Sequence, residues 1–148
     1  MSVRNDIIAN LKTSLEALKT DSYAAEVHTV ESFHVDYVNK YKSQTPVLMI
    51  IDQGNDERLV YDNTNSLFAF DVQLWGYSSD QNYDTMQKSY NDMVASIKQW
   101  IYSNPSLGSY VRDVQFVAGL GVFLDQTHNH ALVQVQIRIL YYCVNGSF

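Results

Sequence analysis

Strict alternation of apolar and polar residues in FAFDVQLWGY, residues 68–77, constrains the fold more than any other feature of the sequence. Alternate side chains of a strand point to opposite faces, so one face of this stretch is apolar and consists of Phe68, Phe70, Val72 and Leu74. We expect this face to join a hydrophobic core. The opposite face has a polar centre and ends in two large aromatics that a purely solvated face does not need: Ala69, Asp71, Gln73, Trp75 and Tyr77.

The closing stretch, residues 131–144, has the same two-faced character. Its apolar side consists of Ala131, Val133, Val135, Ile137 and Ile139, and its other side of Leu132, Gln134, Gln136, Arg138, Leu140 and Tyr142. Asp113 and Gln115 repeat the pattern in a predicted strand at 110–118. Three such strands predict a sheet that helices cover on one side only. The polar centre of the uncovered side favours an ordinary solvated face, whereas Trp75, Tyr77, Leu140 and Tyr142 at its rim favour an assembly surface.

Apolar residues at helical spacing predict two helices. The first covers about 3–19, and the second covers about 86–101 and stops at Asn104 and Pro105. The second helix has three N-cap candidates just before it, Ser78, Ser79 and Asp80. Gln81 is placed to close a capping box onto Ser78. Its apolar stripe of Met86, Met93 and Trp100 is typical of a core-facing helix and needs no cofactor to explain it.

Shorter segments complete the predicted order of elements. Residues 27–35 favour a first strand, and VLMII, after Pro46, is typical of a strand buried on both faces. RLVY is a candidate short strand, DNTNS at 62–66 predicts a turn, and GLGVFLDQTHNH at 119–130 predicts an extended hairpin tip. The sequence therefore predicts a single α+β domain over 1–148, with a mostly antiparallel sheet and the order α-β-β-β-α-β-β.

Composition narrows the classes of function. The chain has 148 residues, 46% of them hydrophobic, which suits one globular domain with a real core. A formal net charge of -6, from 10 Lys and Arg against 16 Asp and Glu, argues against nucleic-acid binding driven by phosphate neutralisation. No apolar run approaches the length of a membrane span, and the start MSVRNDIIANL lacks the layout of a signal peptide. Cys143 is the single cysteine, so the chain is expected to fold in a reducing cytosol. No membrane partner is expected.

Catalytic and metal-binding patterns are weak. His128 and His130 could share a face and reach one metal ion with help from His28, His34 and either Asp36 or Asp125, but histidines at a hairpin tip are more often solvated. Cys143 lies on the apolar phase of the last strand, which favours a buried thiol over a nucleophile. The sequence contains no GxxxxGK[ST] or GxSxG, and GLG at 119–121 lacks the further glycine of a dinucleotide loop. We therefore expect no enzymatic activity and no cofactor.

The layout of the chain resembles that of the tail terminator proteins of long-tailed bacteriophages. The resemblance spans nearly the whole sequence: the N-terminal amphipathic helix, TPVLMII followed by the turn DQGNDE, FAFDVQLWGY leading into a capped helix, and the closing pair YVRDVQFVA and ALVQVQIRILYY. Related neck and tail-completion proteins share much of this outline. These are patterns of layout and not catalytic signatures.

The resemblance implies a structural virion protein that closes the head-proximal end of the tail tube as a hexameric ring. Its implied partners are further copies of itself, the tail tube protein and a neck or head-completion protein, with genomic DNA passing through without specific binding. The implied location is the tail–neck region of the virion, after synthesis in the host cytoplasm. An acidic chain suits such a passage, because like charge keeps the phosphate backbone from binding the wall.

Two groups of residues are the interaction candidates under this hypothesis. The far face of the sheet contributes Asp71, Gln73, Trp75, Tyr77, Asp113, Gln115, Gln134, Gln136, Arg138 and Tyr142, and the loops expected to make axial contacts contribute Asp56, Glu57, Asp125, His128 and His130. The alternatives are a neck or head–tail joining protein of related fold, or a small-molecule-binding α+β module with a pocket ringed by Trp75, Tyr77 and Tyr142.

Overall fold

The computed structural model describes residues 3–20, 22–23, 27–41, 46–60, 65–79, 83–125 and 130–144. Its elements, in chain order, are α1 (Val3–Leu15), the 3-10 turn η1 (Glu16–Lys19), β1 (Thr29–Ser32), α2 (Tyr37–Lys40), β2 (Val47–Asp52), β3 (Glu57–Val60), β4 (Asn65–Ser79), α3 (Tyr83–Tyr102), β5 (Val111–Asp125) and β6 (His130–Val144). The predicted α+β class and order of elements are confirmed, with α2 as an addition.

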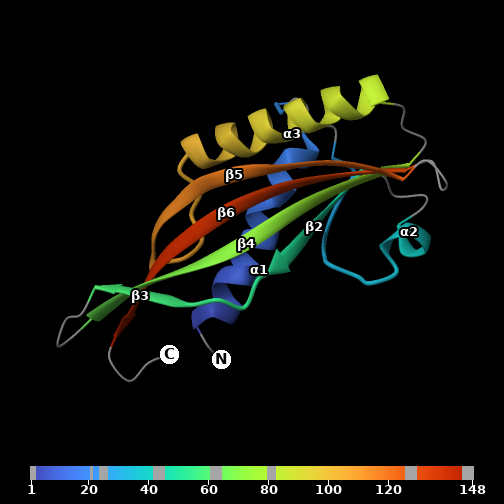
Figure 1. The fold of residues 1–148 in the computed structure, drawn as a ribbon. Helices are drawn as coiled ribbons and strands as arrows, with labels where there is room; N and C mark the ends of the chain where they lie inside the picture. The colour runs from blue at the N-terminus through green and yellow to red at the C-terminus, as the bar shows by residue number, and fades with distance from the viewer. Residues whose placement is uncertain are drawn as a thin grey trace.

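The six strands form one sheet, in which five follow the order β1-β2-β4-β6-β5 and β3 pairs with β4 outside this path (Figure 1). β1 pairs with β2 in parallel, and the other pairings are antiparallel. β4 and β6 pair over their whole length, from Asn65 opposite Val144 to Ser79 opposite His130. β2 and β3 pair one after the other along the other edge of β4, and the loop between them lies beside Asp71.

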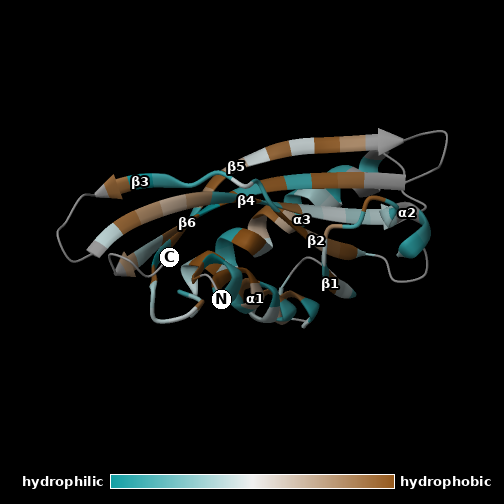
Figure 2. Ribbon diagram, turned by 90° about the horizontal axis from the view of Figure 1, so that it is seen from below, coloured by the Kyte–Doolittle hydropathy of each residue, from teal (hydrophilic) through white to brown (hydrophobic). Residues whose placement is uncertain are grey.

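Both long helices pack on the same side of the sheet (Figure 2). α1 and η1 confirm the helix predicted at 3–19 and bury Ile7, Leu11, Leu15 and Leu18. α3 buries Met93, Ile97 and Trp100 against the strands, as the helical spacing predicted. The indole Nε1 of Trp100 donates a hydrogen bond to Ser14 Oγ at 3.0 Å, which ties the two helices together.

The apolar faces predicted from the alternation form this core. Phe70, Val72 and Leu74 from β4 are buried in it, and β6 adds Val133, Val135, Ile137, Ile139 and Cys143. β2 confirms a strand buried on both faces, because Leu48 and Ile50 join the main core while Val47 and Met49 join a second cluster on the opposite side.

That second cluster lies where the sequence predicted no cover. Tyr37 and Tyr41, from α2 and the residue after it, pack on Val47, Met49, Tyr77 and Leu132. Phe33 stacks edge-on to Trp75 with ring centroids 5.4 Å apart, and Tyr37 does the same to Tyr77 at 5.2 Å. Pairs of this geometry are favourable beyond the area that they bury. The short segment between β1 and β2 therefore covers one corner of the otherwise uncovered face.

Several predicted boundaries are wrong. The extended hairpin tip at 119–130 is strand up to Asp125, with residues 126–129 outside the described ranges. The capping role given to Ser78 and Ser79 is also wrong, because both belong to β4 and pair with β6; Asp80 and Gln81 lie outside the described residues. β1 is shorter than the predicted 27–35, and residues 65 and 66 of the predicted turn belong to β4.

Gly76 provides a direct test of how tightly α3 packs on the sheet. A Cβ added at this position would lie 2.7 Å from both Met93 Cε and Val133 Cγ2. We expect Gly76→Ala to lower the free energy of unfolding by about 1–3 kcal/mol, because extra atoms in a packed core force neighbours to shift. Urea denaturation measures this loss. The same change made in a Met93→Ala background should cost less than it does alone, and strictly additive losses would contradict the proposed contact.

Candidate functional site: the open face of the sheet

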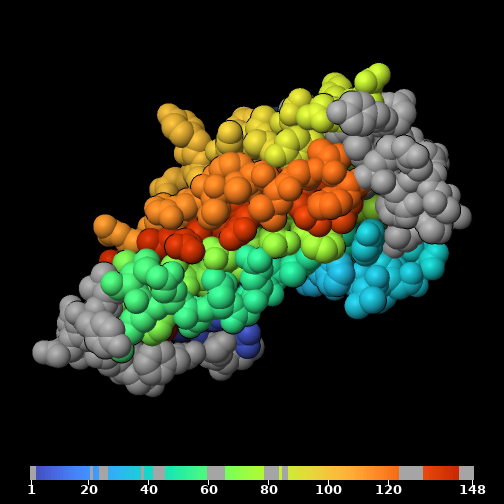
Figure 3. Space-filling view, viewed as in Figure 1, coloured from blue at the N-terminus to red at the C-terminus, as the bar shows by residue number. Residues whose placement is uncertain are grey.

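The candidate site is the face of β4, β5 and β6 opposite the two long helices, called here the open face. Figure 3 looks onto this side, where the strands themselves form the middle of the surface. The pairing places its polar residues in rows: Gln73 lies opposite Gln136, Trp75 opposite Gln134, and Asp113 opposite Leu140. The predicted polar residues of the three strands are thus brought together on one surface.

An ion pair between Asp71 and Arg138 lies at the centre of the open face. The two residues are direct cross-strand partners, and Gln115 lies opposite Arg138 on its other side. Arg138 Nε donates to Asp71 Oδ1 at 2.9 Å, and Nη2 donates to Oδ2 at 3.4 Å. Asp71 is only 7% exposed. A carboxylate this buried needs a charged or hydrogen-bonding partner to remain ionised.

The loop between β2 and β3 completes the surroundings of Asp71. Asn55 Nδ2 donates to Asp71 Oδ2 at 2.8 Å, and Asn55 Oδ1 accepts the backbone N–H of Asp71 at 2.9 Å. The backbone N–H of Gln53 bonds the carbonyl of Asp71 at 3.2 Å. Glu57 lies 3.9 Å from Arg138 Nη1. The loop thus provides hydrogen-bond partners for the backbone of β4 at the position where its neighbouring strand changes from β2 to β3.

These contacts shift the pKa of both partners. The hydrogen bond from Arg138 lowers the pKa of Asp71 below its usual value; burial opposes this shift, and the bond from Asn55 adds to it. The carboxylate in turn raises the pKa of Arg138. Both groups therefore stay charged across the physiological range, and their charges neutralise one another within the chain.

The same loop is held on its other side by the core. Tyr141 donates its hydroxyl to Asp56, at 3.0 Å from Oδ1 and 3.1 Å from Oδ2. Burial, followed by the Asp56 carboxylate, raises the pKa of Tyr141. Arg4, from α1, forms an ion pair with Asp52 and donates to the carbonyl of Asn55 at 2.8 Å. Asp56 and Glu57, predicted as exposed loop contacts, are thus both engaged by groups of their own chain.

The predicted rim aromatics lie at opposite ends of the open face. Trp75 and Tyr77 are covered by Phe33 and Tyr37, and Trp75 Nε1 donates to Gln73 Oε1 at 2.7 Å. Tyr142 lies ten residues along β6 from Leu132, the partner of Tyr77. Ten residues of strand span about 33 Å. Trp75, Tyr77 and Tyr142 therefore do not converge on one pocket.

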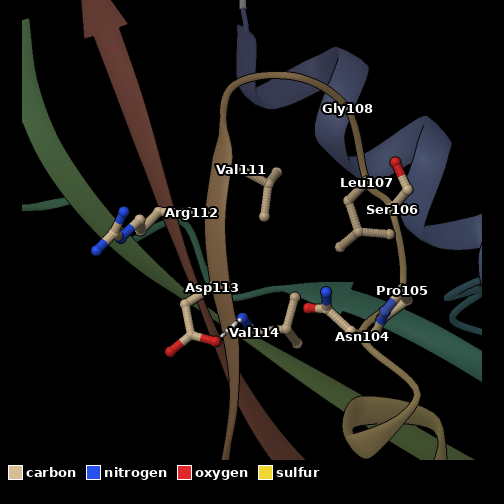
Figure 4. Close-up of a pocket in the computed structure, with 9 residues that line it drawn as sticks. All are labelled: Asn104, Pro105, Ser106, Leu107, Gly108, Val111, Arg112, Asp113 and Val114. Atoms are coloured by element: carbon tan, nitrogen blue, oxygen red, sulfur yellow. Dashed lines mark hydrogen bonds between the residues drawn. The ribbon is translucent and has the colours of Figure 1, made fainter.

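A small cavity of about 240 Å³ lies elsewhere, where the connection after α3 meets the start of β5. Figure 4 shows Val111, Leu107 and Val114 between the two arms of this connection, with Arg112 directed away from it. Asp113 accepts a hydrogen bond from the backbone N–H of Val114 at 2.9 Å. Its lining combines the polar residues Asn104, Ser106 and Asp113 with the apolar side chains and the loop backbone.

The candidate metal ligands are separated in the described part of the chain. His28 Nδ1 bonds Thr29 Oγ1 at 2.9 Å, and His34 Nδ1 accepts the backbone N–H of Asp36 at 3.1 Å. No three of the described His, Cys, Asp and Glu side chains lie close enough to hold an ion. His128 is outside the described residues, as are the side chains of Asp125 and His130. Cys143 is buried as predicted, and burial raises the pKa of its thiol.

The sequence did not predict that β5 continues to Asp125 as a long edge strand of the sheet. Its pairing with β6 shifts register three times, and the residues passed over are Arg112, Val117 and Leu120. A bulge of this kind redirects a side chain, and Val117 and Leu120 are both partly exposed, as is Phe123 nearer the end of the strand. The signal was hidden because each bulge breaks the period of two from which strands are recognised.

The chain was compared with protein-family models and with curated proteins. A scan against protein-family models finds no match, and a search of curated proteins finds none. Among the described residues, no helix is long and apolar enough to cross a membrane. The structure thus defines the class of fold: an α+β chain with one mostly antiparallel sheet, its two long helices on one face, and a largely polar opposite face that α2 covers at one corner.

Proposed function

We propose that the chain is a structural virion subunit that closes the head-proximal end of a bacteriophage tail tube as a ring, six copies to a ring, and joins the tube to the neck. The observation that carries this proposal is the open face. Its centre is polar and organised around the Asp71–Arg138 pair, and the face is accessible mainly along β5 and β6, where Asp113 and Gln115 are exposed and Gln134, Gln136 and Arg138 are half-buried. A subunit of an assembly needs such a surface, whereas an enzyme needs reactive groups that converge on a cavity.

The electrostatics of the open face support an assembly role over a catalytic one. Asp71 and Arg138 form an ion pair with one another, so neither is available as a general acid or base. Apart from the Glu57 carboxylate, 3.9 Å from Arg138 Nη1, Asn55, Gln115 and Gln136 place uncharged polar side chains beside the pair. Such groups can hydrogen-bond a protein neighbour without the large desolvation cost of unpaired charges.

The partners follow from the same proposal. Further copies of the chain close the ring, the tail tube protein binds one rim, and a neck or head-completion protein binds the other. The net charge of -6 supports passage of genomic DNA without specific binding. The proposal places the protein in the tail–neck region of the virion, after synthesis in the host cytoplasm, and assigns it no cofactor. A neck or head–tail joining role on the same fold is the second candidate.

Solution mass and tube binding test this proposal together. Light scattering after size exclusion, over a concentration series, should give a species of about six copies, visible as rings in negative stain. The protein should also bind the end of purified tail tubes. Rings that do not bind tail tubes but do bind a purified neck complex would favour the neck role. A monomer that binds neither would contradict both structural roles.

A further inference from the structure

Exposed apolar side chains gather at two opposite edges of the sheet. On the β5 edge, Val117 is 45% exposed and Leu120 38%, whereas Phe123, 54% exposed, lies opposite Leu132, beside the cluster that α2 covers. At the other end of the strand order, Phe33 and Val35, just after β1, are 37% and 87% exposed. We call these the β5 edge and the β1 corner. The two patches come from different segments of the chain, and β2, β4 and β6 lie between β1 and β5 in the sheet.

The β5 edge is shaped for side-chain contact and not for addition of another strand. Val117 and Leu120 are the extra residues at two of the β5 bulges, so their side chains leave the regular alternation of the strand. Bulges also interrupt the row of backbone groups that a new strand would need. Apolar residues at such positions gain from burial against a complementary apolar surface.

The β1 corner offers that surface. Phe33 is held in place by Trp75 and Tyr37, so its exposed part belongs to a packed aromatic group and not to a free chain. Val35 projects beside it, between Phe33 and the start of α2. A preorganised aromatic anchor loses little conformational entropy when a partner covers it.

The charges beside the two patches are of opposite sign. Lys98 on α3 is exposed and lies 5.0 Å from the ring centroid of Phe116, next to Val117. Asp36 is exposed next to Val35 and accepts a hydrogen bond from Asn39 at 3.0 Å. Within the described ranges neither group forms an ion pair. An apolar contact between the patches brings this cation and this anion together, which favours correct pairing of two copies.

We infer that the β5 edge of one copy packs against the β1 corner of a second copy. Because the two patches differ, the contact is heterologous, and it propagates from copy to copy until the rotation closes a ring. This inference rests on the proposed ring and deepens it by assigning the surfaces that join its subunits. The occupant of both patches is another copy of this chain.

Cysteine cross-linking tests the assigned contact. The variant Val35→Cys/Leu120→Cys, treated with a short bifunctional maleimide, should give a ladder of covalent species that extends to about six copies. Each single-cysteine variant should remain largely monomeric, because a heterologous contact does not place two equivalent sites together. The unmodified protein is the matched control, since its buried Cys143 should not react.

A charge exchange provides an independent readout. Lys98→Glu should weaken self-association about tenfold or more, and adding Asp36→Lys to the same chain should restore it. Efficient dimer formation from Leu120→Cys or Val35→Cys alone, or no cross-linking of the double variant at high concentration and on tail tubes, would overturn the inference. The two proposals fail separately: cross-linked rings that bind neither tubes nor neck contradict the phage role alone, and tube binding without a ladder contradicts the interface alone.

Discussion

Replacing Trp100 with alanine is expected to lower the free energy of unfolding by about 3–5 kcal/mol. Trp100 is 1% exposed and joins α3 to α1 through its bond to Ser14. Its removal leaves a large cavity between helices that cannot collapse onto the sheet, and it deprives the Ser14 hydroxyl of its donor. Domains of this size are stable by only about 5–15 kcal/mol, so the variant should unfold at much lower urea concentration.

Tyr102→Ala is the matched control for this prediction. Tyr102 lies two residues further along the same helix and is 91% exposed, so its truncation should change stability by no more than about 0.5 kcal/mol. Equilibrium urea unfolding of both variants, followed by far-ultraviolet circular dichroism, gives the two values. Equal losses for the two substitutions would contradict the packing of α3 against α1.

Replacing Arg138 with methionine is expected to cost about 2–4 kcal/mol at pH 7. The substitution keeps an unbranched stem about as long as the aliphatic part of arginine but leaves the buried Asp71 carboxylate without its charged partner. The expected cost lies toward the lower part of the range for broken buried pairs, because the Arg138 side chain is 35% exposed to water. Arg112→Met, at an exposed arginine of β5, should be close to neutral.

The pH dependence of this loss has a definite sign. The folded state lowers the pKa of Asp71, so the pair contributes stability above the unfolded pKa, near 4, and loses it as pH falls through the lower folded value. The difference between the wild-type protein and Arg138→Met should therefore be largest at neutral pH and shrink below about pH 4. Thermal unfolding of both proteins from pH 7 to pH 3 measures it. A constant difference over this range would show that the pair does not act through charge.

The parts of the fold that follow from local periodicity could be predicted from the sequence. The alternation at 68–77 and 131–144 identified two strands and their core faces, and helical spacing located both long helices. Burial follows period directly in these elements, because a strand or helix has one face to place against the core. Most of the polar residues of the open face were predicted for the same reason.

The missed features depend on contacts between distant segments. The prediction of a loop at 119–130 failed because glycines and bulges broke the period of β5, which is held in the sheet by its pairing with β6. The cover over Trp75 and Tyr77 was missed because α2 has four residues and too little sequence to show periodicity. The hydrogen bond between Asn55 and Asp71 joins residues 16 positions apart, at the point where the neighbour of β4 changes from β2 to β3.

The sequence by itself determined the α+β class, the order of the long elements, their core-facing side chains and the existence of a second, polar face. Only the tertiary structure decided that Asp71 pairs with Arg138 across 67 positions, that the rim aromatics are covered at one corner, and that exposed apolar groups lie at two opposite edges. The physical reason is the separation along the sequence of the residues that determine each feature. Periodicity is a local property of one element, whereas register, bulges and edge exposure are set by which strands pair and in what order.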